Sequence, residues 1–556
     1  MAAAPDLAAG APAGDGPATG RAAGFAGAAT LIAGLTVASR LAGFGRTLVF
    51  AWAVGATVLG GIYQSANTVP NIIFEIVAGG ALAGLVVPLL ADAVGRQDRA
   101  SVGATTSALL TWVFTLLLPA ALVVALAAEP IVRLLDRNAD PVTVAVGAGM
   151  LRVFAPQLPL YGVGIVLTGV LQAHRRFAWP VLAPLLSSLT VIVAYEAFAA
   201  VAGRKPPIAA VTRGEVLILS VGTTLGVVVL SLCLLLPLRR LGLRLRPAYR
   251  FEAGAARNVR RLAAAGAVTV AAQQLSLTLT IALANGGPHG SLVLYTLALT
   301  VYLLPWAVLA LPIATSTYPA LAEAAARGDR GGYAATLAPA TRGLLLFGCL
   351  GAAALAALAA PLARILAGST AGPQTTGIVA TAIVGFAPGL LGYALFALLT
   401  RALYANGDAR VAALATVLGW GTVAAASLAL AHALPVGRRV VALTGANSVG
   451  MLVLGGLLLG AVAWRAGGSA LHGAARAGLT GVLAGVAGAA AGVGLRHAVW
   501  GGRTPGVVGA VEQGILCGAV VGAVFLAVAF ALDGRDVRPA LTALVRRARR
   551  GLVRGG

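Results

Sequence analysis

Long apolar runs, separated by short charged or Pro/Gly breaks, recur from one end of the 556-residue chain to the other. A helix needs about 20 predominantly apolar residues to cross a bilayer. Unbroken runs of this length predict an all-α polytopic membrane protein, because a β-barrel would show short alternating segments instead. The pattern predicts about fourteen transmembrane helices, at residues 25–54, 62–93, 103–127, 143–172, 180–201, 213–238, 262–285, 291–321, 341–362, 377–405, 411–433, 440–463, 473–495 and 507–532.

Two polar turns occur twice, at nearly one spacing. The sequence VPLLADAVGR (87–96) closes the second run and YPALAEAAAR (318–327) closes the eighth, at a numbering offset of 231. LQAHRRFAWPVL (171–182) and LYANGDARVAAL (403–414) form the other pair, at an offset of 232. Six spans separate the copies, so the two copies point the same way through the membrane. This predicts two six-helix lobes related by a parallel repeat, an arrangement typical of transporters.

The repeat also sets the expected domain boundaries. We expect the first lobe at 25–238 and the second at 262–463, joined by a basic cytoplasmic loop at 239–261. Two further helices fall within 464–532. The Ala/Gly/Pro-rich residues 1–24 are expected to form a disordered cytoplasmic tail, and residues 533–556 a basic one.

The net charge of +23 fits this topology without a nucleic-acid partner. If the N-terminus is cytoplasmic, the inner loops carry more arginines than the outer connections, above all in the 239–261 loop. Such loops fix orientation and meet anionic membrane lipids. We therefore expect both termini on the cytoplasmic side.

Two arginines lie inside the first apolar run, in ASRLAGFGRTL (38–48). Arg40 and Arg46 are six positions apart, so a regular helix would place them about 240° apart. Gly43 and Gly45 between them would allow a bend that turns both guanidiniums toward one cavity. Because arginine matches phosphate bidentately, the functional interpretation is an anion-binding pair. The alternative is that both side chains snorkel to the inner interface.

The second run, NTVPNIIFEIVAGGALAGLVVPLL (67–90), carries a carboxylate in mid-membrane. Glu75 would either pair with an arginine of the first span or act as a cation, proton or coupling site. Pro70 and the Gly79-Gly80 pair are predicted to let this helix bend or pack closely. We expect further polar side chains to line the cavity between the lobes, namely Asn67, Asn71, Gln274 and Thr300.

The sequence lacks the motifs of catalysis. It has no GxxxxGK[ST] phosphate loop, no aspartate-rich metal motif and no triad-like cluster. Its three cysteines lie far apart in apolar runs and are interpreted as small core residues. We therefore predict a transporter rather than an enzyme, with no cofactor.

Several of these stretches together resemble the MurJ/MviN family of lipid II flippases, in the multidrug/oligosaccharidyl-lipid/polysaccharide exporter superfamily. The resemblance is closest to the actinobacterial-type branch and covers about residues 25–465. It is carried by SRLAGFGRTL (39–48), the 67–90 run, LQAHRRFAWPVLAPLL (171–186), LPIATSTYPALAEAAARGD (311–329) and RALYANGD (401–408).

The resemblance implies a V-shaped pair of lobes around a cationic cavity, in the bacterial cytoplasmic membrane. Such a protein would move the polyprenyl-pyrophosphate-linked peptidoglycan precursor, lipid II, to the outer leaflet by alternating access. The drive would be the membrane potential or a sodium or proton gradient.

The family's essential first-span arginines match Arg40 and Arg46, which the resemblance assigns to the pyrophosphate. Some relatives have an aspartate at the position of Gly61 and cavity arginines at the positions of Phe74 and Thr300. Because both arginines are replaced, the cavity is expected to be less basic here. Asp408 resembles a position implicated in sodium binding.

Two other functions stay open at this point. One is an exporter of another lipid-linked glycan or of a drug-like cation, which Glu75 and the reduced arginine set would suit. The other is a non-transporting scaffold that binds cell-wall synthesis proteins. We expect a monomer in each case.

Overall fold

The computed structural model describes residues 18–79, 86–249, 255–367, 372–501 and 506–534, and every regular element in these ranges is helical. The first half of the chain forms α1 (Ala18–Ala53), α2 (Val58–Phe74), the π-helix η1 (Glu75–Gly79), α4 (Val86–Gly95), α5 (Arg99–Leu126), α6 (Ala128–Leu135), α7 (Pro141–Phe154), α8 (Gln157–Ala173), α9 (Ala178–Ala202), the short 3₁₀ turn η2 (Ile208–Ala210), α10 (Arg213–Leu232) and α11 (Leu235–Arg239).

The second half continues with the same succession of long and broken helices. It forms α12 (Ala255–Asn285), α13 (Ser291–Pro305), the π-helix η3 (Trp306–Ala310), α14 (Leu311–Ala326), α15 (Arg330–Ala367), α16 (Pro373–Phe386), α17 (Gly389–Ala405), α18 (Ala409–Ala433), η4 (Val436–Arg438), α19 (Arg439–Ala466), η5 (Gly468–Leu471), α20 (Ala474–Trp500) and α21 (Val507–Leu532).

Within the described ranges, eleven helices are long and apolar enough to cross a membrane, or up to twelve if the pair α16 and α17, bent by 45°, is one span. This confirms a polytopic helical membrane protein. The first two predicted spans are outside that count. The second is divided between α2, which has 17 residues, η1 and α4, with residues 80–85 outside the described part. The number fourteen therefore remains a prediction.

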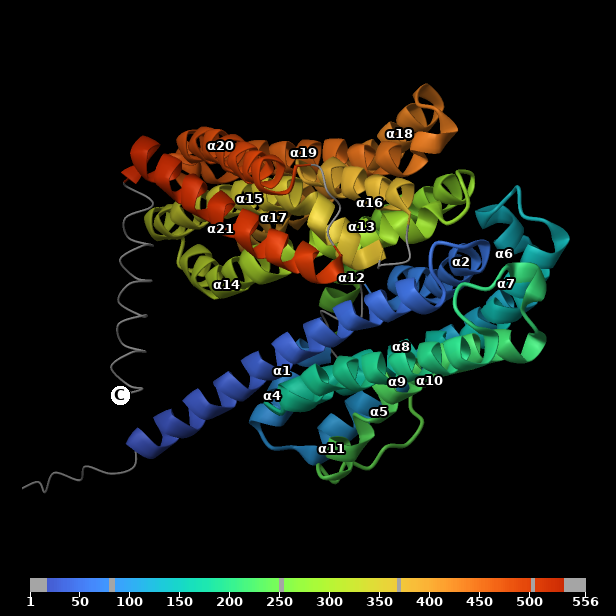
Figure 1. Cartoon of the computed structure of the whole chain (residues 1–556). Helices are drawn as coiled ribbons and strands as arrows, with labels where there is room; N and C mark the ends of the chain where they lie inside the picture. Colours follow the sequence, from blue (N-terminus) through green and yellow to red (C-terminus); the bar gives the residue numbers. More distant parts are fainter. Residues whose placement is uncertain (1–17, 80–85, 250–254, 368–371, 502–505, 535–556) are drawn as a thin grey trace, which may run out of the picture.

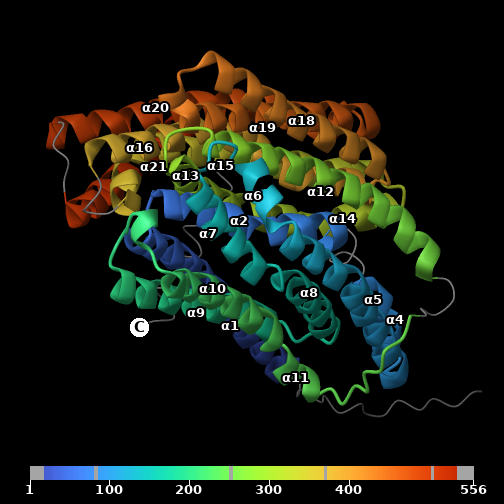
Figure 2. The ribbon, with the colours of Figure 1, turned by 90° about the vertical axis from the view of Figure 1, so that its right-hand side faces the viewer.

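Figures 1 and 2 show α1–α10 gathered in one lobe and α12–α21 in the other. The two lobes repeat one packing pattern. In the first, α9 packs against α1 and α10, α8 against α5, and α7 against α2. In the second, α18 packs against α12 and α19, α17 against α15, and α16 against α13. The last two helices, α20 and α21, pack against each other and against α15.

Two aromatic contacts recur in both lobes, at a numbering offset of 232. Two first-lobe ring pairs have second-lobe counterparts at similar ring-centroid distances. Tyr63–Phe154 at 5.8 Å corresponds to Tyr295–Phe386 at 5.3 Å, and Phe74–Tyr161 at 5.6 Å corresponds to Trp306–Tyr393 at 5.0 Å. Aromatic pairs of this kind add specific packing energy beyond burial. The internal repeat seen in the sequence is thus a repeat of packed structure.

Both lobes also break their helices at corresponding places. α7 ends and α8 begins around Ala155-Pro156, while α16 ends and α17 begins around Ala387-Pro388, which is again an offset of 232. Proline interrupts the helical hydrogen-bond ladder, which explains both breaks. The π-helices η1 and η3 correspond at an offset of 231, and π-segments within helices are frequent at functional sites.

Two expected boundaries were wrong. α1 begins at Ala18, so residues 18–24, expected in the disordered tail, are helical. α12 begins at Ala255, so the end of the expected 239–261 loop is helical too. Residues 18–24 include three alanines, and residues 255–261 include two alanines and three arginines. Alanine and arginine are good helix formers, so each stretch can extend its helix beyond the apolar part.

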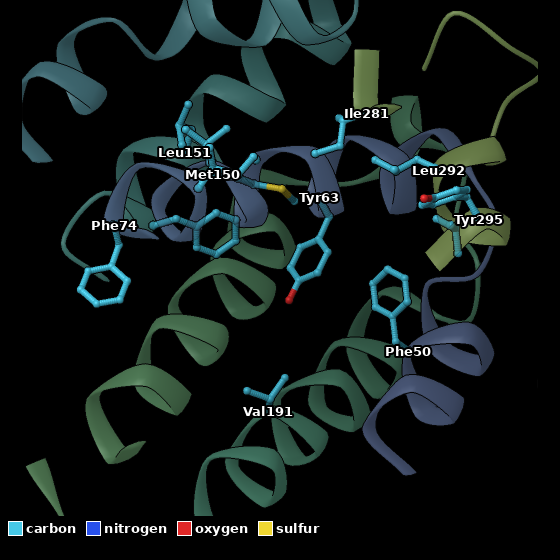
Figure 3. Close-up of a cluster of buried hydrophobic side chains, with 14 of the residues drawn as sticks. Phe50, Tyr63, Phe74, Met150, Leu151, Val191, Ile281, Leu292 and Tyr295 are labelled. Atoms are coloured by element: carbon cyan, nitrogen blue, oxygen red, sulfur yellow. The ribbon is translucent and has the colours of Figure 1, made fainter. Parts of the chain in front are cut away.

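The lobes contact each other through a few elements. η1, α2 and α6 contact α12, and α13 contacts α1 and α2. Figure 3 shows the buried cluster at this junction, where Phe50 and Tyr63 of the first lobe lie beside Ile281, Leu292 and Tyr295 of the second.

Candidate transport site

Arg40 and Arg46 lie on α1, which continues as an unbroken α-helix through Gly43 and Gly45. The two side chains therefore keep the angular separation of a regular helix in this conformation. A Cβ at either glycine would meet nothing within 4 Å. Close packing therefore does not require glycine at positions 43 and 45. Their role as a hinge stays a prediction.

Both arginines are exposed, and neither forms a hydrogen bond or an ion pair with another described residue. The charge of Arg46 acts electrostatically on three phenol groups in the core of the first lobe, those of Tyr63, Tyr161 and Tyr195. The guanidinium groups thus have no carboxylate partner within the described structure, which leaves them able to bind an anion.

Glu75 is the first residue of η1 and is half-buried. It forms no ion pair with any described arginine, so the structural pairing considered from the sequence is not seen in this conformation. η1 contacts α12 of the other lobe, which places Glu75 on a segment at the junction between the lobes. Pro70 is buried inside α2, one turn before η1. Gly79 ends η1, and Gly80 lies outside the described residues.

The four polar residues expected in the cavity have different surroundings. Asn67 on α2 and Gln274 on α12 each bury an amide oxygen that has no hydrogen-bond partner in the described structure, and these two helices contact each other. Asn71 is exposed. Thr300 on α13 is half-buried and donates a hydrogen bond to the Thr296 carbonyl at 2.9 Å. Its hydroxyl is therefore satisfied by its own helix.

An interlobe hydrogen-bond cluster that we did not expect lies at the C-terminal end of α12. Asn285 Nδ2 donates to Ser65 Oγ at 2.9 Å and to the Leu135 carbonyl at 3.0 Å, which joins the second lobe to α2 and α6 of the first. In sequence, Asn285 is only a polar residue at the end of an apolar run. Its partners stand 220 and 150 residues away, so no local pattern could have identified it.

Two further features lie at the same end of the lobes as Asn285. Gly290 has φ +81°, and a Cβ there would lie 2.3 Å from the Ala56 carbonyl oxygen, so the lobes approach closely at this glycine. Burial raises the pKa of the Asp136 carboxyl above its ordinary value, and the charge of His289 from the other lobe partly opposes this. The arginine distribution predicts this end to face outward.

Asp408, the residue suggested for sodium, has both carboxylate oxygens in contact with other side chains in this conformation, and a sodium site there stays a prediction. One carboxylate oxygen lies 3.4 Å from Arg465 Nε, and the other accepts a hydrogen bond from Asn406 Nδ2 at 2.7 Å. Both oxygens are thus engaged, one of them by a cation of the protein itself. No cluster of three or more His, Cys, Asp or Glu side chains occurs among the described residues. The geometry is that of a local turn with a salt bridge.

The sequence model of one protein family, described as "Lipid II flippase MurJ", matches residues 50–498. The match begins after Arg40 and Arg46. The chain is 28% identical over 392 residues to the lipid II flippase MurJ of Burkholderia cenocepacia, covering 68% of this chain and 72% of that protein. It is 27% identical over 392 residues to the probable lipid II flippase MurJ of Rhizobium meliloti, covering 68% of this chain and 70% of that one.

Solved structures show the same fold. A lipid II flippase MurJ in an inward closed conformation matches with a TM-score of 0.70 at 17% identity, covering 90% of this chain and 99% of that one. A multidrug resistance transporter of the MATE family in an inward-facing conformation matches with a TM-score of 0.58 at 16% identity, covering 78% of this chain and 95% of the other.

Proposed function

The chain belongs to the lipid II flippase MurJ family, and from this premise we propose that it carries lipid II from the inner to the outer leaflet of the bacterial cytoplasmic membrane by alternating access. The protein is a transporter of a lipid-linked substrate and carries out no covalent chemistry. Both termini face the cytoplasm, and a monomer is the working unit.

The observation that carries this proposal is the pair of arginines on α1, which have no ion-pair partner among the residues that the structure describes. A charged side chain in the middle of a membrane helix costs roughly 2.5–3.5 kcal/mol on insertion scales. Such residues are retained where they serve an ion or ligand pathway. Arginine presents a planar fork of donors that fits phosphate oxygens, so Arg40 and Arg46 bind the pyrophosphate of the substrate.

Glu75 serves as the counter-charge or coupling group of this site. It stands on a π-helical segment that touches the opposite lobe, so a change in its protonation would alter the junction at which the lobes meet. The gradient that drives transport acts through a proton at Glu75 in this proposal. We assign no sodium ion to Asp408, because Arg465 already neutralises it.

Asn285 supplies two hydrogen bonds between the lobes, at the end predicted to face outward. Figure 1 shows the N-terminal half of α1 running away from the second lobe at the other end. This arrangement supports an inward-facing state, from which the lobes would close at the cytoplasmic end and separate at the outer end.

The test is replacement of the arginines in cells depleted of their own lipid II flippase. Arg40→Ala and Arg46→Ala should each lower the outer-leaflet exposure of lipid II by roughly 10–100-fold, the loss of a charge-assisted hydrogen bond worth about 1.5–3 kcal/mol. The conservative Arg40→Lys and Arg46→Lys variants should retain part of the activity, because the charge remains and only the fork geometry is lost.

If the alanine variants restore growth and lipid II exposure as well as the unaltered protein does, the arginines do not bind the substrate. If depletion of the protein leaves lipid II exposure unchanged, the chain is a non-transporting scaffold or exports another molecule.

A further inference from the structure

The end of the lobe junction that is predicted to face outward contains a cavity of about 210 Å³. Its described lining comes from both lobes. The first lobe supplies the end of α1, the α1–α2 turn and Lys205, and the second supplies α13, the end of α15 and the start of α16. A single water needs only about 10–15 Å³ of such space, so the cavity has room for a larger polar group.

This cavity lies where the lobes close on each other, on the outward side of the proposed substrate site. Ala56, which lines it, is the residue that Gly290 of the second lobe approaches closely. Ala51, which also lines it, stands five residues after Arg46, about 7.5 Å further along α1. Separation of the lobes at this end would therefore open the cavity on the outward side of Arg46.

Lys205 is the only lysine of the chain and the only charged residue among the described residues that line the cavity. It is half-buried, in the connection between α9 and α10. Burial, and then the charge of Arg204, lower the pKa of its ammonium below the ordinary value. Arg204 itself lies over the Trp52 ring at 5.0 Å, so this connection brings two cations to the outer end of α1.

The fold holds Lys205 in a backbone conformation that lysine rarely adopts. Its φ is +55°, in the left-handed region, where a Cβ is strained. Its N–H donates to the Ala53 carbonyl at 2.8 Å, and its stem packs on Gly55, where a Cβ would lie 3.0 Å from the lysine side chain. Strained residues of this kind cluster at ligand sites, and here the strained backbone fixes a cation at the cavity.

The second lobe has a counterpart of Lys205 that does not line this cavity. At an offset of 232, Gly55 corresponds to Gly287, and a Cβ at Gly287 would lie 2.9 Å from the stem of Arg439. Arg439 Nη1 donates to the Ala431 carbonyl near the end of α18 at 2.7 Å, a favourable place for a cation. Arg439 therefore stabilises its own lobe, whereas Lys205 lines a space between the lobes.

The lining favours an anion with several oxygen acceptors. None of the described lining residues is acidic. Thr375 lines the wall formed by the second lobe, and its side chain forms no hydrogen bond with another described residue. It also belongs to the first turn of α16, whose N-terminal end carries a partial positive charge. Lysine binds phosphate as a point charge, and a hydroxyl can donate to a second phosphate oxygen.

We propose that Lys205 and Thr375 bind the pyrophosphate of the substrate at the outer end of its route, once the lobes have separated there. This inference rests on the flippase function and adds a second anion site to it. Arg40 and Arg46 hold the charged group while the cytoplasmic end is open, and Lys205 receives it when the outer end opens. A cation on the outward side lowers the cost of moving this charge through the apolar interior.

The binding test uses the purified full-length protein in detergent, with inorganic pyrophosphate as the probe and sodium chloride of equal ionic strength as the reference. An amine-reactive acyl ester can modify only Lys205 and the α-amino group, and peptide mass spectrometry measures both in one sample. Pyrophosphate at about ten times its dissociation constant should slow the acylation of Lys205 roughly tenfold and leave that of the α-amino group unaffected.

Variants of the protein provide matched controls for this assay. Thr375→Val removes the hydroxyl at nearly constant volume and should weaken pyrophosphate binding roughly tenfold. In the double variant Lys205→Gln/Arg439→Lys, the only lysine stands at the second-lobe position, and pyrophosphate should not protect it. Asn285→Ala, which loses two hydrogen bonds between the lobes, should favour the open state and bind pyrophosphate more tightly.

The transport test uses cells depleted of their own lipid II flippase. Lys205→Gln should lower the outer-leaflet exposure of lipid II roughly tenfold, whereas Lys205→Arg should keep most of it because the charge remains. The inference is overturned if pyrophosphate does not protect Lys205, if it protects the lysine of Arg439→Lys equally, or if Lys205→Gln transports like the unaltered protein. Failure of the flippase proposal is distinguishable, because it shows as unchanged lipid II exposure after depletion, whatever the protection assay gives.

Discussion

At the scale of single residues, Asn285 holds the two lobes together at one end. Its two hydrogen bonds, to Ser65 Oγ and the Leu135 carbonyl, cross from one lobe to the other. A hydrogen bond contributes about 0.5–1.5 kcal/mol net, so Asn285→Ala should shift the equilibrium between inward and outward states by about 1–3 kcal/mol toward outward. Spin-label distances between Arg99→Cys and Arg330→Cys, at the starts of α5 and α15, should shorten in a larger fraction of molecules.

The partner variant tests whether the hydrogen bond itself is responsible. Ser65→Ala should give a smaller shift, because Asn285 keeps its bond to Leu135. In the double variant, the two effects should fall short of additivity by about 1 kcal/mol, the signature of a direct contact. Fully additive effects would mean that Asn285 acts on the lobes by another route.

At the scale of helices, small residues determine how closely α17 and α19 cross. A Cβ at Gly392 would lie 1.8 Å from the Met451 carbonyl oxygen, and Gly455 faces Gly392 at the same crossing. Gly392→Ala must push the two helices apart, and overpacking of this kind typically costs about 1–3 kcal/mol. The melting temperature of the detergent-solubilised protein should fall.

Gly456 provides a matched control on α19. A Cβ there would meet nothing within 4 Å, so Gly456→Ala should leave the melting temperature unchanged or raise it, since alanine favours the helix by up to about 1 kcal/mol. Equal destabilisation by both variants would show that helix contact at Gly392 is not the limiting feature.

At the scale of the whole molecule, alternating access requires the lobes to separate at the end that Asn285 now closes. A short cleavable bismaleimide crosslink between Ser65→Cys and Asn285→Cys should abolish lipid II exposure, and cleavage of the linker should restore it. The background variant replaces the natural cysteines Cys233, Cys349 and Cys517 with alanine.

Each single-cysteine variant, treated with the same reagent, controls for modification alone and should keep the activity of its untreated form. Transport that continues with both lobes crosslinked would rule out separation at this end as part of the cycle.

Much of the architecture could be predicted because its signals are local or strictly periodic. An apolar run of about 20 residues is itself the reason a helix crosses a bilayer, so the helical membrane fold followed from the pattern alone. The repeat was visible in two polar turns, and the structure extends it to ring pairs such as Tyr63–Phe154 and Tyr295–Phe386. The family resemblance also rested on contiguous stretches.

The candidate site was only partly predictable. The sequence identified Arg40, Arg46 and Glu75 as costly charges within apolar runs, because a charge in a membrane helix stands out without any knowledge of its neighbours. Whether Glu75 forms an ion pair with either arginine depends on how η1 lies relative to α1. The structure shows no ion pair between them, a result that spacing along the chain could not supply.

The sequence by itself thus determined that this protein is a two-lobed helical transporter of the membrane, with two arginines inside its first apolar run. Only the tertiary structure decided where the lobes meet. Asn285 finds its partners 150 and 220 residues away. Such contacts depend on distant side chains sharing one space, whereas the apolar pattern records only each segment's preference for lipid over water.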